Sequence, residues 1–551
     1  MPTADLIVTN ARVLTVDPER PRAEAVAIVG DTILAVGDRA EVMATKGPAT
    51  RVIDAAGNSV TPGFVEAHLH LFPGAAELDQ CHLRDVQDVE GFHAKVRAYA
   101  AARPGEPLIV GQGATYTMLS AEAVITRHDL DAAVPDRPFV MFAADHHTAW
   151  ANTAALEKAG ILGGRAIGVG NEIVMGADGL ASGELREREA FGPVLELSTS
   201  GGRERCGLSG YEPETTPAER AYDRDVLKRG LAYLAAHGIT SFHNMDGNRY
   251  QLDLLGEMEA VGELICRARV PFHFLNFMDL DRLEAASELS AQYRSERLSC
   301  GFVKLFMDGV LESWTAVMAE DYADRPGWRG EPLFAPARFA EIATEIDRRG
   351  LQIAVHAIGD GAVNSVLDGY AAARRANGPR DGRHRVEHVE VALASDIPRF
   401  SELGVIASMQ PPHPPGSGFP LEPTLTRLGR ARWPQAYAWN TLREAGARLA
   451  FASDWPVSPV DPMDGIRLAM TRQPWEPGLP DQRQSLDQAL AGYTADGAYA
   501  EFMEHRKGRL KPGMLADLVV FGGDMAAAEP EAIAAIRPVI TICGGSITFE
   551  A

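Results

Sequence analysis

Residues 58–74, NSVTPGFVEAHLHLFPG, end a short apolar run with two histidines, His68 and His70. Residues two apart on a β-strand face the same side, so we expect both imidazoles to converge at the strand's carboxyl end. Neutral imidazole is the commonest transition-metal ligand, and Zn²⁺ accepts it readily. Two histidines at this spacing can also be polar residues of a loop. Other residues of the chain are needed to distinguish a metal site from a loop.

The pattern of a short apolar run followed by an amphipathic stretch recurs along the chain, as in residues 219–238 and 338–350. That alternation is typical of βα units and a parallel sheet. Eight such runs predict an α/β fold of the (β/α)8 barrel type rather than an open sheet. The predicted strands are 60–66, 239–244, 270–277, 302–307, 351–356, 383–388, 404–409 and 448–454.

Both ends of the chain are β-rich. Runs cut by Gly, Asp and Asn turns predict strands within 4–10, 25–37 and 51–58, and again within 516–521 and 538–550. We expect the two termini to build one small β-domain. The interval from His70 to Ile239 is far longer than the roughly 2–6 residues of a βα loop, so it must hold its own structure. Its glycine-rich part, 161–179, reads as a lid or as a passive insertion.

Composition excludes several classes of function. The 551 residues carry 75 Asp and Glu against 53 Lys and Arg, a net charge of −22 that disfavours binding to nucleic acid or to an anionic membrane surface. No run approaches the roughly 18–20 apolar residues of a membrane span, and the first residues lack a signal peptide's basic start. Five scattered cysteines suit reduced thiols. We therefore predict a cytoplasmic protein. A homodimer is one possible oligomeric state.

Other unusual polar residues end further predicted strands, where catalytic groups lie in barrel enzymes. Lys304 interrupts an apolar run; burial would lower its pKa, and a neutral amine can capture CO₂ as a carbamate that bridges two metals. Its alternative is an ion pair with Asp308. His356, His388 and Asp454 end the fifth, sixth and eighth predicted strands. Taken together, these strand ends predict one metal centre.

This ordered set resembles the amidohydrolase superfamily, and more closely its YtcJ-like branch, which is similar to N-substituted formamide deformylases. The likeness covers essentially the whole chain and rests on TPGFVEAHLH, GITSFHNM, VKLFMDG, VHAIGDGA, RVEHVE, SMQPPH, ASDWPV and KGRLKPGMLADLVVF. It implies a (β/α)8 barrel at 61–505, an insertion at 75–235, and a composite β-sandwich from 1–60 and 506–551. It also implies hydrolysis of a C–N bond in a small-molecule amide at one or two divalent metals, chiefly zinc.

Carried onto this sequence, the resemblance assigns a complete set of metal ligands: His68, His70, Lys304 in carboxylated form, His356, His388 and Asp454. The segment DHHTAWANTAAL, 145–156, corresponds to a polar motif of the family's inserted region. It makes His147 and Asn152 candidates for substrate contact. Weaker candidates for the same role are Glu312, Trp314 and His413.

The implied mechanism is attack by a metal-bound hydroxide, with Asp454 taking the proton and passing it to the leaving amine. One alternative is a mononuclear aminohydrolase that deaminates a ring. Such deaminases resemble one another in an HxxE element after the fifth strand, but here Gly359 stands at the Glu position and Asp360 is the nearest acid. The other alternative is a non-catalytic, metal-stabilised binding protein, which would show a lost ligand, and none is lost.

Overall fold

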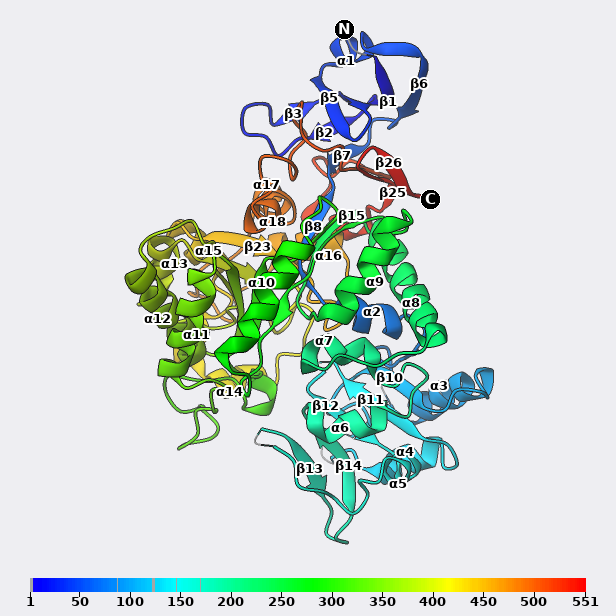
Figure 1. Ribbon diagram of the computed structural model, residues 1–551, viewed down its shortest axis with the longest axis vertical. Coiled ribbons are helices and arrows are strands. Elements are labelled where there is room, and N and C mark those ends of the chain that lie inside the picture. The colour runs from blue at the N-terminus through cyan, green and yellow to red at the C-terminus, as the bar shows by residue number, and fades with distance from the viewer. Residues whose placement is uncertain (1–2, 87, 121–123, 145, 169) are drawn as a thin grey trace. The chain divides into compact units, whose positions relative to one another are not determined.

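The computed structural model describes the whole chain except residues 1–2, 87, 121–123, 145 and 169 (Figure 1). Asp145 of the predicted polar motif thus lies outside the described residues. The chain divides into two compact units. The first comprises Met1–His70, Gly207–Glu212 and Leu231–Ala551, and the second comprises Leu71–Cys206 and Pro213–Gly230.

Two sheets of parallel strands form the centre of the first unit. One has the order β18 (Leu298–Ser299), β16 (Arg267–Arg269), β15 (Ile239–Asn244), β8 (Phe64–Leu69). The other has the order β17 (Phe272–His273), β19 (Phe302–Phe306), β20 (Gln352–Ala357), β21 (Arg385–His388), β22 (Ile406–Met409), β23 (Arg448–Phe451). Parallel strands joined by helical connections are the α/β class that the apolar periodicity predicts.

Most predicted strands are present within two or three residues of their expected bounds, with two differences. The first predicted strand becomes β7 (Ser59–Pro62) followed by β8. The third becomes β16 and β17, which pair with β18 and β19 respectively. Pro271 stands between them, and a proline has no N–H to donate to a ladder, so the strand is interrupted there.

Amphipathic helices follow the parallel strands in the first unit. In α11 the buried residues Phe339, Ile342, Ala343 and Ile346 recur every three or four positions, which gives this helix one apolar face. The helices are α9 (Arg249–Ala260), α10 (Leu283–Gln292), α11 (Pro336–Arg348), α12 (Asp360–Asn377), α13 (Ile397–Leu403), α14 (Thr424–Leu428), α15 (Trp439–Glu444), α16 (Pro462–Thr471), α17 (Leu486–Gly492) and α18 (Ala495–Ala500). The N-terminal part adds α1 (Arg39–Met43).

One six-stranded sheet draws on both ends of the chain, in the order β26 (Ser546–Glu550), β25 (Pro538–Cys543), β24 (Leu518–Phe521), β7, β2 (Arg12–Leu14), β3 (Arg22–Ala23). A four-stranded sheet has the order β5 (Thr32–Gly37), β4 (Ala25–Val29), β1 (Ala4–Thr9), β6 (Lys46–Asp54). Side chains of both sheets, among them Leu6, Val26, Val60 and Leu518, bury a common apolar core. Distant segments are thus joined by shared burial.

The second unit contains its own sheet, as the length of the interval predicts. The order is β13 (Glu172–Met175), β14 (Ala181–Arg186), β12 (Thr148–Ala151), β11 (Phe139–Ala143), β10 (Ile109–Ala114), β9 (Cys81–His82). Its helices are α2 (Leu71–Glu77), α3 (Val89–Ala102), α4 (Arg127–Ala133), α5 (Thr153–Lys158) and α6 (Arg188–Leu195). Helices α7 (Cys206–Ser209) and α8 (Pro217–Ala236) cross the boundary between the units. A lid role for 161–179 stays a prediction.

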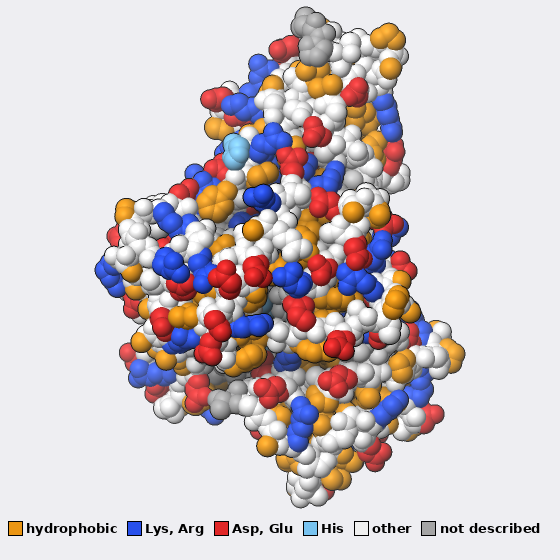
Figure 2. Space-filling view, viewed as in Figure 1, with side chains coloured by type: hydrophobic (Ala, Val, Ile, Leu, Met, Phe, Trp, Pro, Cys, Tyr) orange, Lys and Arg blue, Asp and Glu red, His pale blue; other side chains and the backbone are white. Residues whose placement is uncertain are grey.

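The surface mixes charges of both signs. Figure 2 shows acidic and basic side chains interspersed over the face that it draws, with hydrophobic side chains between them. Among the described residues, no helix is both long enough and apolar enough to cross a bilayer. Most acidic side chains are outside the buried set, and the carboxylates that are buried need local explanations.

Candidate metal centre

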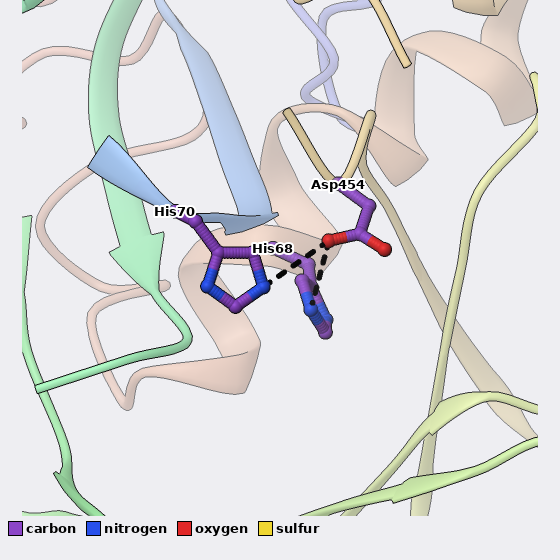
Figure 3. Close-up of side chains that lie close together, drawn as sticks. All are labelled: His68, His70 and Asp454. Atoms are coloured by element: carbon purple, nitrogen blue, oxygen red, sulfur yellow. Dashed lines mark ion pairs between the residues drawn. The ribbon is translucent and has the colours of Figure 1, made fainter. Parts of the chain in front are cut away.

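Two histidines and an aspartate from opposite ends of the strand series meet in the first unit (Figure 3). His68 and His70 lie at the end of β8, and Asp454 lies just beyond β23. The Nε2 atoms of His68 and His70 are 3.3 and 3.4 Å from Oδ1 of Asp454. The backbone N–H of Asp454 donates to the carbonyl of His68 at 2.9 Å, so this contact is fixed by main chain as well as by side chains.

Three polar atoms of this centre are buried without a hydrogen-bond partner among the residues that the structure describes: Nε2 of His68, Oδ1 of Asp454 and Nζ of Lys304. An unsatisfied buried polar group costs about 1–3 kcal/mol, so a cluster of them indicates a missing ligand. Imidazole and carboxylate are the donors that Zn²⁺ and similar cations accept. The residues therefore fit a divalent metal.

Each histidine of the β8 pair is held through its other ring nitrogen by a buried carboxylate. Nδ1 of His68 lies 2.7 Å from Oε2 of Glu387, and Nδ1 of His70 lies 2.9 Å from Oδ1 of Asp246. An ionised carboxylate only accepts, so each Nδ1 carries a proton, and Nε2 is the ring nitrogen that each histidine can offer to a metal. This arrangement orients a metal-binding histidine and raises its basicity.

The other two predicted histidine ligands form hydrogen bonds to neutral groups, and Nε2 of His356 also lies 3.7 Å from Oδ1 of Asp308. Nδ1 of His388 is 2.9 Å from Oε1 of Gln410, and Nε2 of His356 is 3.0 Å from the carbonyl oxygen of Gly309. The ring centroid of His388 lies 4.5 Å from that of His356 and 4.8 Å from that of His68. The structure therefore brings all four predicted histidines into one cluster.

The electrostatics of the cluster suit metal binding. Burial holds the pKa of His68 and of His388 well below its usual value, which keeps both rings neutral. Burial also opposes protonation of His70, but hydrogen bonds to Asp246 and Asp454 raise its pKa to about 9. Burial would raise the pKa of Asp454, but the opposing effect of His68 and His70 is larger. The net pKa lies below the usual value, so the carboxylate is ionised. A cation at Nε2 of His70 would displace its proton.

Lys304 on β19 is fully buried, and burial lowers its pKa to about 8. Its Nζ lies 4.6 Å from the centre of the Phe306 ring. The alternative ion pair with Asp308 is not found: that carboxylate accepts backbone N–H bonds from Val317, Ile358 and Gly359 at 2.9–3.0 Å. Lys304 is thus a buried amine that is neutral in part near pH 8, the state that reaction with CO₂ requires.

His413 also belongs to this cluster. Its Nε2 lies 3.9 Å from Oδ2 of Asp454, and its Nδ1 lies 3.6 Å from Oε1 of Glu390. Its ring stacks on His388 with centroids 5.9 Å apart and an interplanar angle of 8°. His413 therefore lies directly beside two of the predicted ligands, and its ring could itself hold a metal together with His388 and Asp454.

Glu312 and Trp314 lie in the loop after β19, and both contact side chains of α14. The hydroxyl of Thr424 donates to Glu312, and the guanidinium of Arg427 lies 3.6 Å from the centre of the Trp314 ring. The indole N–H of Trp314 donates to Asp324 at 3.2 Å. A substrate contact for either residue stays a prediction.

Two further candidates lie in the second unit. Nδ1 of His147 is 2.9 Å from Oε1 of Glu187. The buried side-chain amide of Asn152 accepts from the N–H groups of Phe139 and Ala155 and donates to two backbone carbonyls, so it holds α5 and β11 together. A substrate role for both residues stays a prediction.

Sequence reasoning missed Glu387, Asp246 and Gln410. Glu387 stands in RVEHVE directly before His388, and Asp246 and Gln410 each follow a predicted strand. Their positions beside predicted strand ends could therefore have identified them as candidate site residues. What the sequence could not show is which histidine each residue contacts, because that depends on neighbours from other strands.

Comparison with known proteins places the chain among related sequences. It is 31% identical to Protein LONG AFTER FAR-RED 3 of Arabidopsis thaliana, over 94% of this chain and 87% of that protein. It is 28% identical to the putative amidohydrolase YtcJ of Bacillus subtilis (strain 168), over 98% of each. It is 26% identical to the N-substituted formamide deformylase of Arthrobacter pascens, over 99% of this chain and 98% of that enzyme.

The fold has a solved counterpart in an uncharacterized metal-dependent hydrolase from Pyrococcus furiosus. The TM-score is 0.70 at 26% identity, and the match covers 93% of this chain and 98% of that one. The sequence family described as the Amidohydrolase family matches residues 51–549. The chain, with its convergent histidines and aspartate, therefore belongs to the amidohydrolase family and is a YtcJ-like member of it.

Proposed function

We propose that this protein hydrolyses the C–N bond of a small amide, N-formyl amine or cyclic amide at a divalent metal centre. The observation that carries the proposal is the meeting of His68 Nε2, His70 Nε2 and Asp454 Oδ1 within 3.3–3.4 Å, two of these atoms being buried without a hydrogen-bond partner among the described residues. Family membership supports a metal-dependent hydrolase that acts on C–N bonds. The amide class follows from similarity to the formamide deformylase.

We further propose that the two parallel sheets close into a (β/α)8 barrel at 61–505. Two observations support closure. Leu69 at the end of β8 forms a parallel bridge with Trp455 after β23, and only two residues separate β16 from β17. The same proposal assigns 1–60 and 506–551 to a composite β-sandwich and 75–235 to an insertion, which the mixed-terminus sheet and the separate sheet of the second unit support.

The metal would be held by a set of six side chains, with zinc as the expected ion and Lys304 as a carbamate bridge if two ions are bound. When bound, it would polarise the substrate carbonyl and acidify a water. The set is His68, His70, Lys304, His356, His388 and Asp454.

Asp454 then moves the proton. It is ionised and buried beside two histidines, so its carboxylate can accept a proton from the attacking water as the new C–O bond forms. As the C–N bond breaks, the same oxygen returns that proton to the leaving nitrogen. The products are a carboxylic acid, or formic acid from an N-formyl substrate, and an amine. We propose that His413, whose Nε2 lies 3.9 Å from Oδ2 of Asp454, assists this proton transfer.

Ring deamination is less well supported. Asp360 is the acid nearest to the position that deaminases use, but its carboxylate accepts from the N–H of Ala319 at 2.7 Å and lies 3.4 Å from Arg432. It is thus engaged at the start of α12 rather than available as a proton shuttle. A binding protein without activity would be expected to lose a ligand, and all six are present.

A substrate panel tests the proposal. Purified protein would be stripped of metal, reloaded with Zn²⁺, and assayed on N-formyl amines, N-acyl amines, cyclic amides and aminated rings. We expect amine release from at least one amide class only after reloading. Full metal occupancy with turnover of aminated rings alone would favour the deaminase, and occupancy with no turnover, together with ligand binding that survives Asp454→Asn, would favour the binding protein.

A further inference from the structure

The histidines proposed as metal ligands differ in the groups that contact their second ring nitrogen. In the half formed by His68, His70 and Asp454, both histidines have a carboxylate on Nδ1, from Glu387 and Asp246. In the half formed by His356 and His388, the hydrogen bonds come from the carbonyl of Gly309 and the amide oxygen of Gln410, and the carboxylate of Asp308 lies farther off, 3.7 Å from Nε2 of His356. A carboxylate makes the imidazole that it faces a stronger donor to a cation than a neutral amide does.

Glu387 is fixed by more than its contact with His68. Nε of Arg385 lies 2.7 Å from its Oε1, and both side chains are fully buried. The Arg385 guanidinium also donates to Ser408 on β22 at 2.9 Å and to the carbonyl of Ala67 on β8, the residue directly before His68, at 2.6 Å. Arg385 thus ties three strands around Glu387, so the carboxylate cannot turn away from His68.

Asp246 is fixed by a neutral group instead. The side-chain amide of Gln251 donates to its Oδ2 at 2.6 Å, which leaves Oδ1 for His70. The amide of Gln251 brings no positive charge to Asp246, whereas Arg385 brings one to Glu387.

We propose that the two halves of the centre bind metal with unequal affinity, and that Glu387 and Asp246, as positioning residues, make the His68, His70 and Asp454 half the tight one. The first equivalent of metal occupies that half, and the second enters the Lys304, His356 and His388 half more weakly. This inference rests on the proposed metal-dependent function, but it concerns binding order rather than the reaction.

Stepwise titration of the full-length apoprotein with Co²⁺ tests it. Binding would be followed by visible absorbance and by competition with a chelator, without any assay of activity. We expect two resolved steps. Glu387→Gln and Asp246→Asn should each weaken the first step about 10–100-fold, the usual cost of losing such a partner, and should leave the second step nearly unchanged. Gln410→Glu should strengthen the second step, because it gives His388 a carboxylate.

A matched control keeps the result specific. Oδ1 of Asp347 lies 3.1 Å from Nε2 of His384, a carboxylate–histidine pair that is not part of the metal cluster. Asp347→Asn should leave both steps unchanged. Thermal unfolding of each apoprotein would detect misfolding. Glu387→Gln removes the charge opposite Arg385, and if that variant does not fold, Asp246→Asn still tests the inference.

The outcomes separate this inference from the proposed function. Two equal binding steps, or a first step that neither Glu387→Gln nor Asp246→Asn weakens, would overturn the inference while leaving a metal-dependent hydrolase intact. Failure of the wild-type protein to bind Co²⁺ or Zn²⁺ at all would overturn the proposed function itself.

Discussion

Nε2 of His68 lies 3.3 Å from Oδ1 of Asp454, although the two residues come from the first and last strands of the parallel series. Asp454 has a φ of 61°, a left-handed conformation that is uncommon outside glycine. Strained backbone of this kind persists where the surrounding structure holds it, and it concentrates at functional sites. The conformation therefore serves to present the carboxylate to both histidines.

Asp454→Asn should abolish hydrolysis. The amide cannot accept the water's proton, and general acid–base catalysis alone contributes about 10²–10⁴-fold, so kcat should fall by at least that factor. Steady-state rates on the best substrate of the panel provide the measurement, with metal content determined on the same samples. Asp347→Asn serves as the buried-carboxylate control. A variant that keeps its metal and more than a tenth of its rate would remove Asp454 from the role of proton carrier.

Lys304→Ala should reduce the metal content. If a carbamate on Lys304 bridges two ions, the bound metal should drop from about two equivalents to one or none, because metal sites lose affinity with each ligand removed. Elemental analysis of purified protein checks this. Lys507→Ala is a matched control, since Lys507 is also buried but pairs with Glu501 at 2.7 Å. An unchanged metal count in the Lys304 variant would rule out the bridge.

Metal uptake should depend on pH and on bicarbonate. Burial lowers the pKa of Lys304 to about 8, so the neutral amine becomes the major form as pH rises through that value. Carbamate formation joins the neutral amine nitrogen to CO₂ and releases one proton. Bicarbonate should therefore accelerate uptake of the second metal at about pH 9 and have little effect at about pH 6. Equal stimulation at both values would mean that another group limits uptake.

Asp517→Asn should destabilise the protein. Asp517 pairs with Arg267 on β16 through contacts of 2.8 and 3.1 Å, and breaking a buried ion pair from one side costs about 3–5 kcal/mol. Burial would raise the pKa of Asp517, but Arg267 lowers it below the usual value. The stabilisation is thus present above the ordinary aspartate pKa of about 3.9 and is lost as pH falls through the folded value.

Thermal unfolding at neutral and acidic pH would measure this effect. The midpoint of Asp517→Asn should lie well below wild type near pH 7, and the difference should shrink in acid. Asp481→Asn, which breaks an exposed pair with Arg483, is the control and should change stability by no more than about 1 kcal/mol. A difference that grows in acid would contradict the assigned sign.

Asn152→Ala separates a structural role from substrate binding. The buried amide satisfies four backbone groups, so its loss should cost at least about 2 kcal/mol and lower the unfolding midpoint. Ser485→Ala removes a single helix-capping bond in α17 and should cost about 1 kcal/mol. A rise in KM with no loss of stability would instead support the predicted contact between Asn152 and substrate.

The sequence by itself determined the α/β alternation, the paired histidines and the candidate ligands at the strand ends, because strand and helix periodicities are local properties of the chain. It did not show that Pro271 divides the third strand, that Asp308 accepts from backbone N–H groups rather than pairing with Lys304, or that Glu387 and Asp246 support His68 and His70. Those features depend on which strands lie side by side and in what register. Only the tertiary structure decides that, since side chains far apart in sequence become neighbours through burial of a common core.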